Sequence, residues 1–160
     1  MPALPELLST YRGRVVPEWV DYNGHLRDAF YLLIFSLASD ELMNQIGLDE
    51  AGRKASGNSL FTLECHLNYL HEVKQDTEVT VRTQILGHDS KRLRIFHSLY
   101  REGQDDPVAT NEQMLLHVDM AGPRSSPFGP AVLERVSALA QSHQALGLPR
   151  HAGRSISLPA

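Results

Sequence analysis

A short polar segment just before residue 29 carries the side chains of this chain that are best suited to chemistry. It places an acid, an amide, a glycine and a histidine within five positions, from Asp21 to His25. A carboxylate can act as a nucleophile or as a general base on water. The first amides of a following helix, around Gly24 to Asp28, would carry partial positive charge and could polarise a carbonyl group. The segment therefore predicts a site at the start of a helix.

Each of these side chains also has a purely structural explanation. Asp21 could cap a turn together with Asn23, and Asn23 could form an Asx-turn rather than orient the loop or an attacking water. Gly24 would let a substrate approach the backbone closely. His25 could orient Asp21, bind a substrate carbonyl or fill a gap in the core, and the sequence leaves these roles open.

The segment is followed by an apolar run over residues 29–38 in which only Ser36 is strongly polar. We expect a helix from residue 29 to about Ile46, with Asp28 as its N-cap and Gly47 at the left-handed position after its end. The run is apolar on every side, which predicts a helix enclosed by other structure. It is about half the ~20 residues that a membrane span requires.

The remaining chain changes to a period of two, which is typical of strands. A first strand is expected over residues 13–20, interrupted at Pro17, and residues 47–58 should form a polar connection. A strand, a helix and a run of further strands make an α+β order in which an antiparallel sheet must curl around the apolar helix. The later strands are expected at residues 60–69, 79–85, 93–100 and 108–118, before a surface helix at residues 131–146.

Composition narrows the classes of protein to which the chain can belong. Its 160 residues fit a single domain, residues 1–160 with a core at about 12–145, and a net charge of -4 leaves no basic footprint for nucleic acid. One cysteine, Cys65, excludes an internal disulfide and fits a reducing compartment. We see no signal-peptide pattern and no membrane segment, so a cytoplasmic location is expected.

The eight histidines do not predict a metal site. They are scattered from His25 to His151, none forms a His-x-x-x-His pair, and Cys65 does not join them in a ligand cluster. We therefore expect no metal and no other cofactor.

The order of these features resembles the hot-dog fold of the 4-hydroxybenzoyl-CoA thioesterase-like family over residues 12–145. Asp21 stands three residues before Gly24, as the catalytic aspartate of that family precedes its glycine. The stretch Gly-His-Leu at 24–26, followed by Ala-Phe-Tyr at 29–31, is similar to the family's Gly-His-Val…Tyr stretch. Asp-Tyr-Asn-Gly-His-Leu at 21–26 is also similar to the betainyl-CoA thioesterases of carnitine breakdown, and Asp-x-Asn-x-His to plant acyl-ACP thioesterases. The pair Arg27-Asp28 departs from the two asparagines that many relatives carry.

The resemblance implies hydrolysis of a small acyl-CoA, with Asp21 as the attacking group and helix amides as the oxyanion hole. Because hot-dog sites form between subunits and a single curled sheet leaves an exposed edge, a homodimer or tetramer is expected. The implied catalytic group is Asp21, Asn23, Gly24, His25 and Asp28. The implied substrate contacts are Trp19, Tyr22, Tyr31, Glu64, Tyr69 and Arg92.

The implied substrate contacts are supported by different observations. Aromatic faces attract a quaternary ammonium, so aromatic residues near the loop, Phe30 among them, fit a betainyl group, although plain core packing also explains them. Arg92 is a candidate for the CoA phosphates, with Lys91, Arg94 and Arg124 as alternatives, but exposed charges need no ligand. Glu64 shares a strand face with His66 and Asn68, which a solvated sheet face also explains.

Two other functions remain open on the same fold. Hot-dog hydratases resemble Asp-x-Asn-Pro-x-His, with the histidine five positions after the aspartate, whereas His25 lies four after Asp21. A non-catalytic acyl-binding protein would not need Asp21. The sequence also leaves open whether Asp21 is nucleophile or base, which acyl group is used, and whether the assembly is a dimer or a tetramer.

Overall fold

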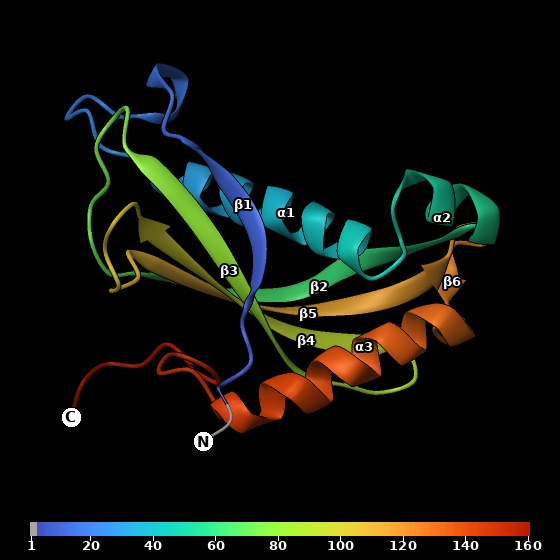
Figure 1. Cartoon of the computed structure of the whole chain (residues 1–160). Coiled ribbons are helices and arrows are strands. Elements are labelled where there is room, and N and C mark those ends of the chain that lie inside the picture. The colour runs from blue at the N-terminus through green and yellow to red at the C-terminus, as the bar shows by residue number, and fades with distance from the viewer. Residues whose placement is uncertain (1–2) are drawn as a thin grey trace.

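An antiparallel sheet curls around one long helix (Figure 1). In the computed structural model, which describes residues 3–160, the strand order is β1-β3-β4-β5-β2, and β6 pairs with β5. The strands are β1 (Leu8–Arg14), β2 (Asn58–Tyr69), β3 (Glu78–His88), β4 (Arg92–Arg101), β5 (Ala109–Asp119) and β6 (Arg124–Ser125). The α-helices are α1 (Asp28–Gln45), α2 (Glu50–Ser56) and α3 (Pro130–His143), with 3-10 turns at Pro17–Trp19 and Gln144–Leu146.

The sheet wraps the helix as the α+β order predicts. Helix α1 contacts β1, β2, β3 and β5, which is possible only because the sheet is curved. Along β3 the expected alternation is confirmed, since Val79, Val81 and Ile85 are buried among the core residues. Helix α3 packs against β3, and its Arg135 Nε donates to the carbonyl of Gln45 at the end of α1.

Two predictions are wrong, one about the first strand and one about the connection after α1. The first strand lies at Leu8–Arg14 rather than at residues 13–20, and Pro17 opens a 3-10 turn. Proline has a fixed φ and no N–H, so it suits the first turn of a helix better than a strand. The expected polar connection contains α2, which Asp49 caps by accepting from the Gly52 amide, and which ends at Gly57 with φ +71°.

Strand β2 does not carry the single apolar face that its alternation predicted. A register shift between Thr62 and Glu64 inserts an extra residue, and a bulge of this kind exchanges the two faces of a strand. Leu60 and Leu67 therefore both pack on the core although their positions differ in parity. Phe61 and Leu63 are 40% and 55% exposed on this edge strand.

Helix α1 has the expected end but not the expected cover. Asp28 is the first helical residue rather than the expected N-cap, which is Arg27, and Gly47 follows the helix with φ +95°. One face buries residues from Tyr31 to Met43, whereas Leu33 and Leu37 on the helix are each 38% exposed. Enclosure on every side is therefore not achieved within one chain.

Beneath α1, a chain of polar side chains crosses the core. Thr83 Oγ1 lies 2.7 Å from His97 Nδ1, and His97 Nε2 lies 2.9 Å from Ser39 Oγ. Ser39 donates its proton to Gln113 Oε1 at 2.8 Å. Because the hydroxyl has one proton, it must accept from His97 Nε2–H. Burial disfavours the charged imidazole, so the ring is neutral and Nδ1 accepts from Thr83. This satisfied chain holds the helix against β3, β4 and β5.

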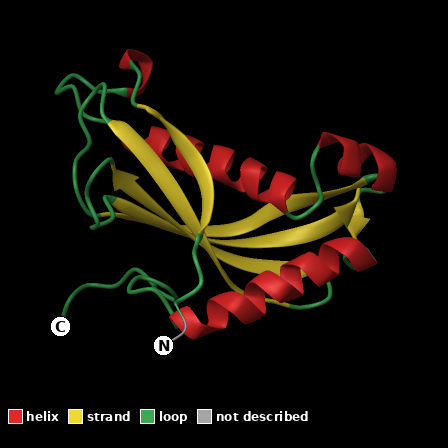
Figure 2. Ribbon diagram, in the orientation of Figure 1, coloured by secondary structure: helices red, strands yellow, loops and turns green. Residues whose placement is uncertain are grey.

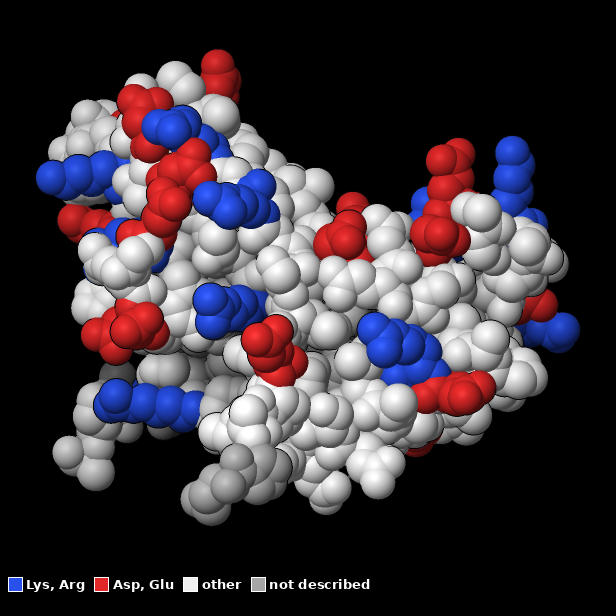
Figure 3. Space-filling model, viewed as in Figure 1, with Lys and Arg blue, Asp and Glu red and all other residues white. Residues whose placement is uncertain are grey.

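No helix among residues 3–160 is long and apolar enough to cross a membrane. On the face drawn in Figure 3, acidic and basic side chains are interspersed.

The buried imidazole predicts a pH dependence of stability. Burial lowers the pKa of His97 from 6.5 to about 3. Below the ordinary pKa the unfolded chain binds a proton here and the folded chain does not, so the free energy of unfolding falls as the pH falls toward the folded pKa. Urea titrations should give a loss of ~2 kcal/mol between pH 7.5 and pH 5 that is absent from His97→Gln. Equal losses in both proteins would contradict this origin.

Candidate active site

The loop from Asp21 to Leu26 is a closed turn rather than an open connection. The Asp21 amide donates to the carbonyl of His25 and the Gly24 amide to that of Asp21, each at 2.9 Å. Val20 and Leu26 form a bridge where the loop closes. Gly24 has φ +74°, and nothing lies within 4 Å of a Cβ built there. The glycine is therefore explained by its backbone conformation.

This loop is docked against the segment that joins β2 to β3. The Leu26 amide donates to the carbonyl of Val73 at 2.7 Å, and the Gln75 amide to that of Gly24 at 3.0 Å. His25 and Lys74 form an isolated bridge between these bonds. In Figure 2 the loops gather at this end of the molecule, beside the start of α1. Main-chain bonds thus dock the loop onto the segment between β2 and β3.

The Asp21 carboxylate has one anchored and one free oxygen. Its Oδ1 accepts from the amides of Asn23 at 2.9 Å and His25 at 3.3 Å, which is the expected Asx-turn. Within residues 3–160, Oδ2 has no hydrogen-bond partner. The structural and the chemical explanations of Asp21 are therefore compatible, because the cap orients the free oxygen.

At the start of α1, one amide is free to bind a ligand. From residue 23 to residue 30, the amides other than that of Asp28 all donate to acceptors within the described chain. The Ala29 amide donates to the Asp28 side chain at 2.8 Å. The sequence suggested the amides around Gly24 to Asp28 as donors to a carbonyl group. Of these, the Asp28 amide remains available.

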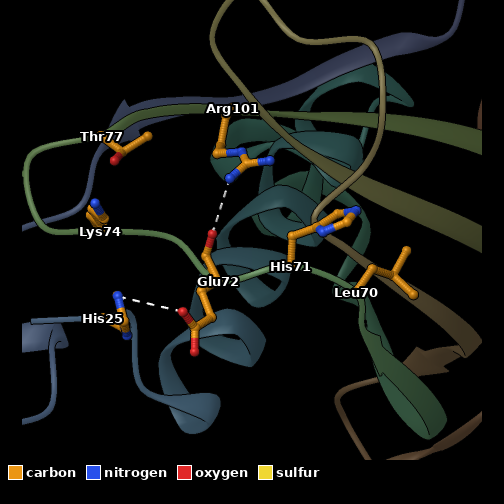
Figure 4. A pocket seen from close by; sticks show the side chains of 7 residues that line it. All are labelled: His25, Leu70, His71, Glu72, Lys74, Thr77 and Arg101. Atoms are coloured by element: carbon orange, nitrogen blue, oxygen red, sulfur yellow. Dashed lines mark hydrogen bonds and ion pairs between the residues drawn. The ribbon is translucent and has the colours of Figure 1, made fainter. Parts of the chain in front are cut away.

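A cavity of about 640 Å³ opens beside the loop (Figure 4). His25 Nε2 lies 3.5 Å from Glu72 Oε2, so the imidazole pairs with Glu72, and its ring forms no hydrogen bond to Asp21 among residues 3–160. Arg101 Nη1 donates to the Glu72 carbonyl at 3.3 Å. The cavity is lined by His25, Leu70, His71, Glu72, Lys74, Thr77 and Arg101.

A second cavity, of about 280 Å³, adjoins the first at Glu72 and includes two tyrosines. The rings of Tyr31 and Tyr69 meet at 89° with centroids 5.1 Å apart. Tyr31 donates its hydroxyl to the carbonyl of His71, and Tyr69 donates to that of Asp28, both at 3.2 Å. Burial, and then the negative charges of Tyr69 and Glu72, raise the pKa of Tyr31 to about 12. Burial first, and then the charge of Asp28, raise the pKa of Tyr69.

The remaining predicted substrate contacts line neither of these two cavities. Trp19 stacks on Phe30 at 6.1 Å against the core, and Tyr22 is 93% exposed. Glu64 and Arg92 line a separate cavity of about 660 Å³ with Leu63, Leu86 and Met114, among other residues. The structure therefore brings the loop residues, Asp28, Tyr31 and Tyr69 together, but not Glu64 or Arg92.

Residues that sequence reasoning missed come from the loops between strands. Glu72 and Lys74 belong to the β2–β3 segment, and Arg101 ends β4. Their place beside His25 depends on loop docking, for which the local sequence holds no signal. Within residues 3–160, no group of three or more His, Cys, Asp or Glu side chains could hold a metal ion.

Comparisons with known proteins identify the family of this chain and its relatives. Residues 15–136 match the model of the family described as the thioesterase-like superfamily. A betainyl-CoA thioesterase from Pseudomonas aeruginosa is 62% identical over 98% of both chains. An L-carnitine dehydrogenase/betainyl-CoA thioesterase from Agrobacterium fabrum is 41% identical over 93% of this chain, which spans 30% of that protein.

Two solved structures have the same architecture. One, from Pseudomonas putida KT2440, has a TM-score of 0.84 and 53% identity over 99% of this chain and 100% of its own. The other, a Staphylococcus aureus protein in complex with CoA, has a TM-score of 0.88 and 28% identity with the same coverage. They confirm the hot-dog fold expected from the sequence.

The conformation of Gly24 predicts a specific cost of adding a side chain. An L-residue with positive φ loses ~1–2 kcal/mol, so Gly24→Ala should lower the free energy of unfolding by about that amount in urea titrations. Gly87→Ala is the matched control, because Gly87 has no positive φ and equally open surroundings. Equal effects of the two substitutions would show that the backbone of the loop is not constrained at Gly24.

Proposed function

Because this chain belongs to the thioesterase-like superfamily, we propose that it hydrolyses the thioester bond of betainyl-CoA. It is an acyl-CoA thioesterase by its similarity to enzymes of that activity. The finer assignment of the acyl group rests on one observation, the 62% identity to a betainyl-CoA thioesterase over 98% of both chains. The named activity of the Agrobacterium relative, over the part that this chain matches, supports the same substrate.

The proposed attacking group is the free oxygen of Asp21. Two amides hold Oδ1, so Oδ2 points in a fixed direction while retaining a full hydrogen-bonding capacity. It serves either as the nucleophile on the thioester carbonyl or as the base that deprotonates an attacking water. In this proposal Asn23, Gly24 and His25 act through their backbone, by closing the turn that positions the carboxylate.

The proposed oxyanion hole is the amide of Asp28. It is the free donor at the positive end of α1, and the helix dipole adds to its effect on a developing negative charge. No side chain has to move for this amide to act.

The arrangement favours hydrolysis over the other two functions. A hydratase requires a histidine paired with the aspartate, whereas the His25 ring pairs with Glu72. An acyl-binding protein would not need a carboxylate oxygen held free of partners. Glu64 remains a proposed substrate contact and Arg92 a proposed contact of the CoA phosphates, and a partner subunit would have to bring them to the loop.

We infer that the functional unit is a homodimer or a dimer of dimers. The edge of β2 exposes Phe61 and Leu63, and α1 exposes Leu33 and Leu37. Unpaired strand edges with apolar side chains invite pairing with another chain. A second copy could extend the sheet at β2 and cover the open face of α1.

The assembly can be measured by light scattering after size exclusion. The wild-type mass should be two or four times the chain mass of 17.9 kDa. Leu33→Glu should shift the protein toward the single-chain mass, because a charge buried in an apolar interface is unfavourable. Leu148→Glu is the control, since this leucine is 68% exposed on the C-terminal segment. A wild-type protein with the single-chain mass would contradict the inference.

Asp21 should be required for turnover and not for folding. Asp21→Ala and Asp21→Asn should each lower kcat for betainyl-CoA by ~100-fold or more, the loss typical of an acid–base group. The asparagine variant is the sharper one, because its side-chain oxygen can still accept from the two amides. Its free energy of unfolding should stay near that of the wild type. Release of CoA at the wild-type rate by either variant would exclude the mechanism.

A further inference from the structure

The cavity between Tyr31 and Tyr69 has features that the hydrolytic mechanism does not use. Its two rings form a perpendicular corner, and their hydroxyl groups are engaged by main-chain carbonyls. The hydroxyl groups therefore hold the rings in place rather than bind a ligand. The volume of about 280 Å³ is at the lower limit of small-molecule sites, ~300 Å³. The cavity thus suits a small group that is recognised without hydrogen bonds.

The charge of this cavity is negative. Asp28 and Glu72 line it, and no lysine or arginine does. Among residues 3–160, Asp28 has no ion-pair partner and Glu72 has only His25, at 3.5 Å. The neighbouring cavity shares Glu72 but is also lined by Lys74 and Arg101. The two adjoining cavities therefore differ in the sign of the net charge of their lining residues.

The cavity also lies where the acyl group must be. Asp28, the residue whose amide is the proposed oxyanion donor, also lines the cavity. In a betainyl thioester one methylene separates the carbonyl carbon from the ammonium nitrogen, a distance of about 2.5 Å from bond lengths. A carbonyl bound at the Asp28 amide consequently places the ammonium directly beside this residue.

We propose that Tyr31, Tyr69 and the carboxylates of Asp28 and Glu72 bind the quaternary ammonium and give the enzyme its preference for a cationic acyl group. This inference rests on the proposed function. A trimethylammonium group has no N–H to donate, so it is recognised by aromatic faces and negative charge. The other aromatic residues near the loop do not serve, because Tyr22 is 93% exposed and Trp19 and Phe30 stack on each other.

The proposal is tested with two esters of nearly the same shape, betainyl-CoA and the uncharged 3,3-dimethylbutyryl-CoA. The wild-type kcat/KM should favour betainyl-CoA by ~30-fold, the factor expected from a desolvated cation–π contact. Tyr69→Leu removes a ring that is 51% exposed within the chain. It should reduce the preference to within ~3-fold, because kcat/KM should fall much further for betainyl-CoA than for the neutral ester.

Three further variants separate the ring from its surroundings. Tyr69→Phe retains the ring and should retain the preference. Asp28→Asn retains the amide and removes the charge, so it should lower kcat/KM for betainyl-CoA by ~5-fold more than kcat/KM for the neutral ester. Tyr100→Leu is the control, because this ring lies on β4 with the Arg82 guanidinium 5.8 Å away. This substitution should change kcat/KM for neither ester.

The outcomes separate this inference from the proposed function. A wild-type enzyme that hydrolyses neither ester refutes the function and the site together. Equal hydrolysis of both esters, or an equal loss for both in Tyr69→Leu, overturns the ammonium site and leaves an acyl-CoA thioesterase. Selective loss of betainyl-CoA hydrolysis in Tyr69→Leu, with Tyr69→Phe unaffected, supports it.

Discussion

The candidate site depends on the main-chain docking of one loop onto another. Leu26 and Val73 are both buried, and the bond between the Leu26 amide and the Val73 carbonyl lies in the core. With the bond from Gln75 to Gly24, it makes the Asp21 loop a structural part of the sheet-and-helix framework. A buried amide that loses its partner costs ~1–3 kcal/mol, so this docking is strongly favoured. It sets the position of the Asp21 carboxylate relative to the start of α1.

From this docking follows a division of charge around the site. The segment that receives the loop supplies Glu72 to both cavities and Lys74 to the larger one alone, and the Glu72 side chain pairs with His25. Betainyl-CoA has the same division, with a cationic acyl group and an anionic nucleotide on either side of the thioester. The net charge of -4 does not reveal this pattern, because the pattern depends on which short segments the fold brings together.

The regular elements could be predicted because their signals are local. The apolar run of α1 and the alternation of β3 follow from side-chain period alone, and both agree with the structure. The bulge in β2 could not be predicted, since it depends on pairing with β5 across the sheet. The hydrogen-bonded chain of Ser39, His97 and Gln113 could not be predicted either, because its members come from three separate elements.

The site could be predicted in part for the same reason. Asp21, Asn23, Gly24 and His25 are adjacent in sequence, so their turn was accessible to local reasoning. Local reasoning could not decide between a capping and a chemical role for Asp21. In the structure Oδ1 caps the turn, and Oδ2 stays available for the proposed chemistry. The pairing of Tyr31 with Tyr69 requires the end of β2 to meet the start of α1, which only the fold provides.

The most direct test of the central claim is a crystal structure of Asp21→Asn with intact betainyl-CoA. Removal of the attacking carboxylate should trap the substrate in a protein with an unchanged loop. We expect the thioester oxygen at ~3 Å from the Asp28 amide nitrogen, a normal hydrogen-bond distance, and the trimethylammonium group against Tyr31 and Tyr69. A thioester bound away from the start of α1, for instance in the cavity beside Arg92, would contradict the account.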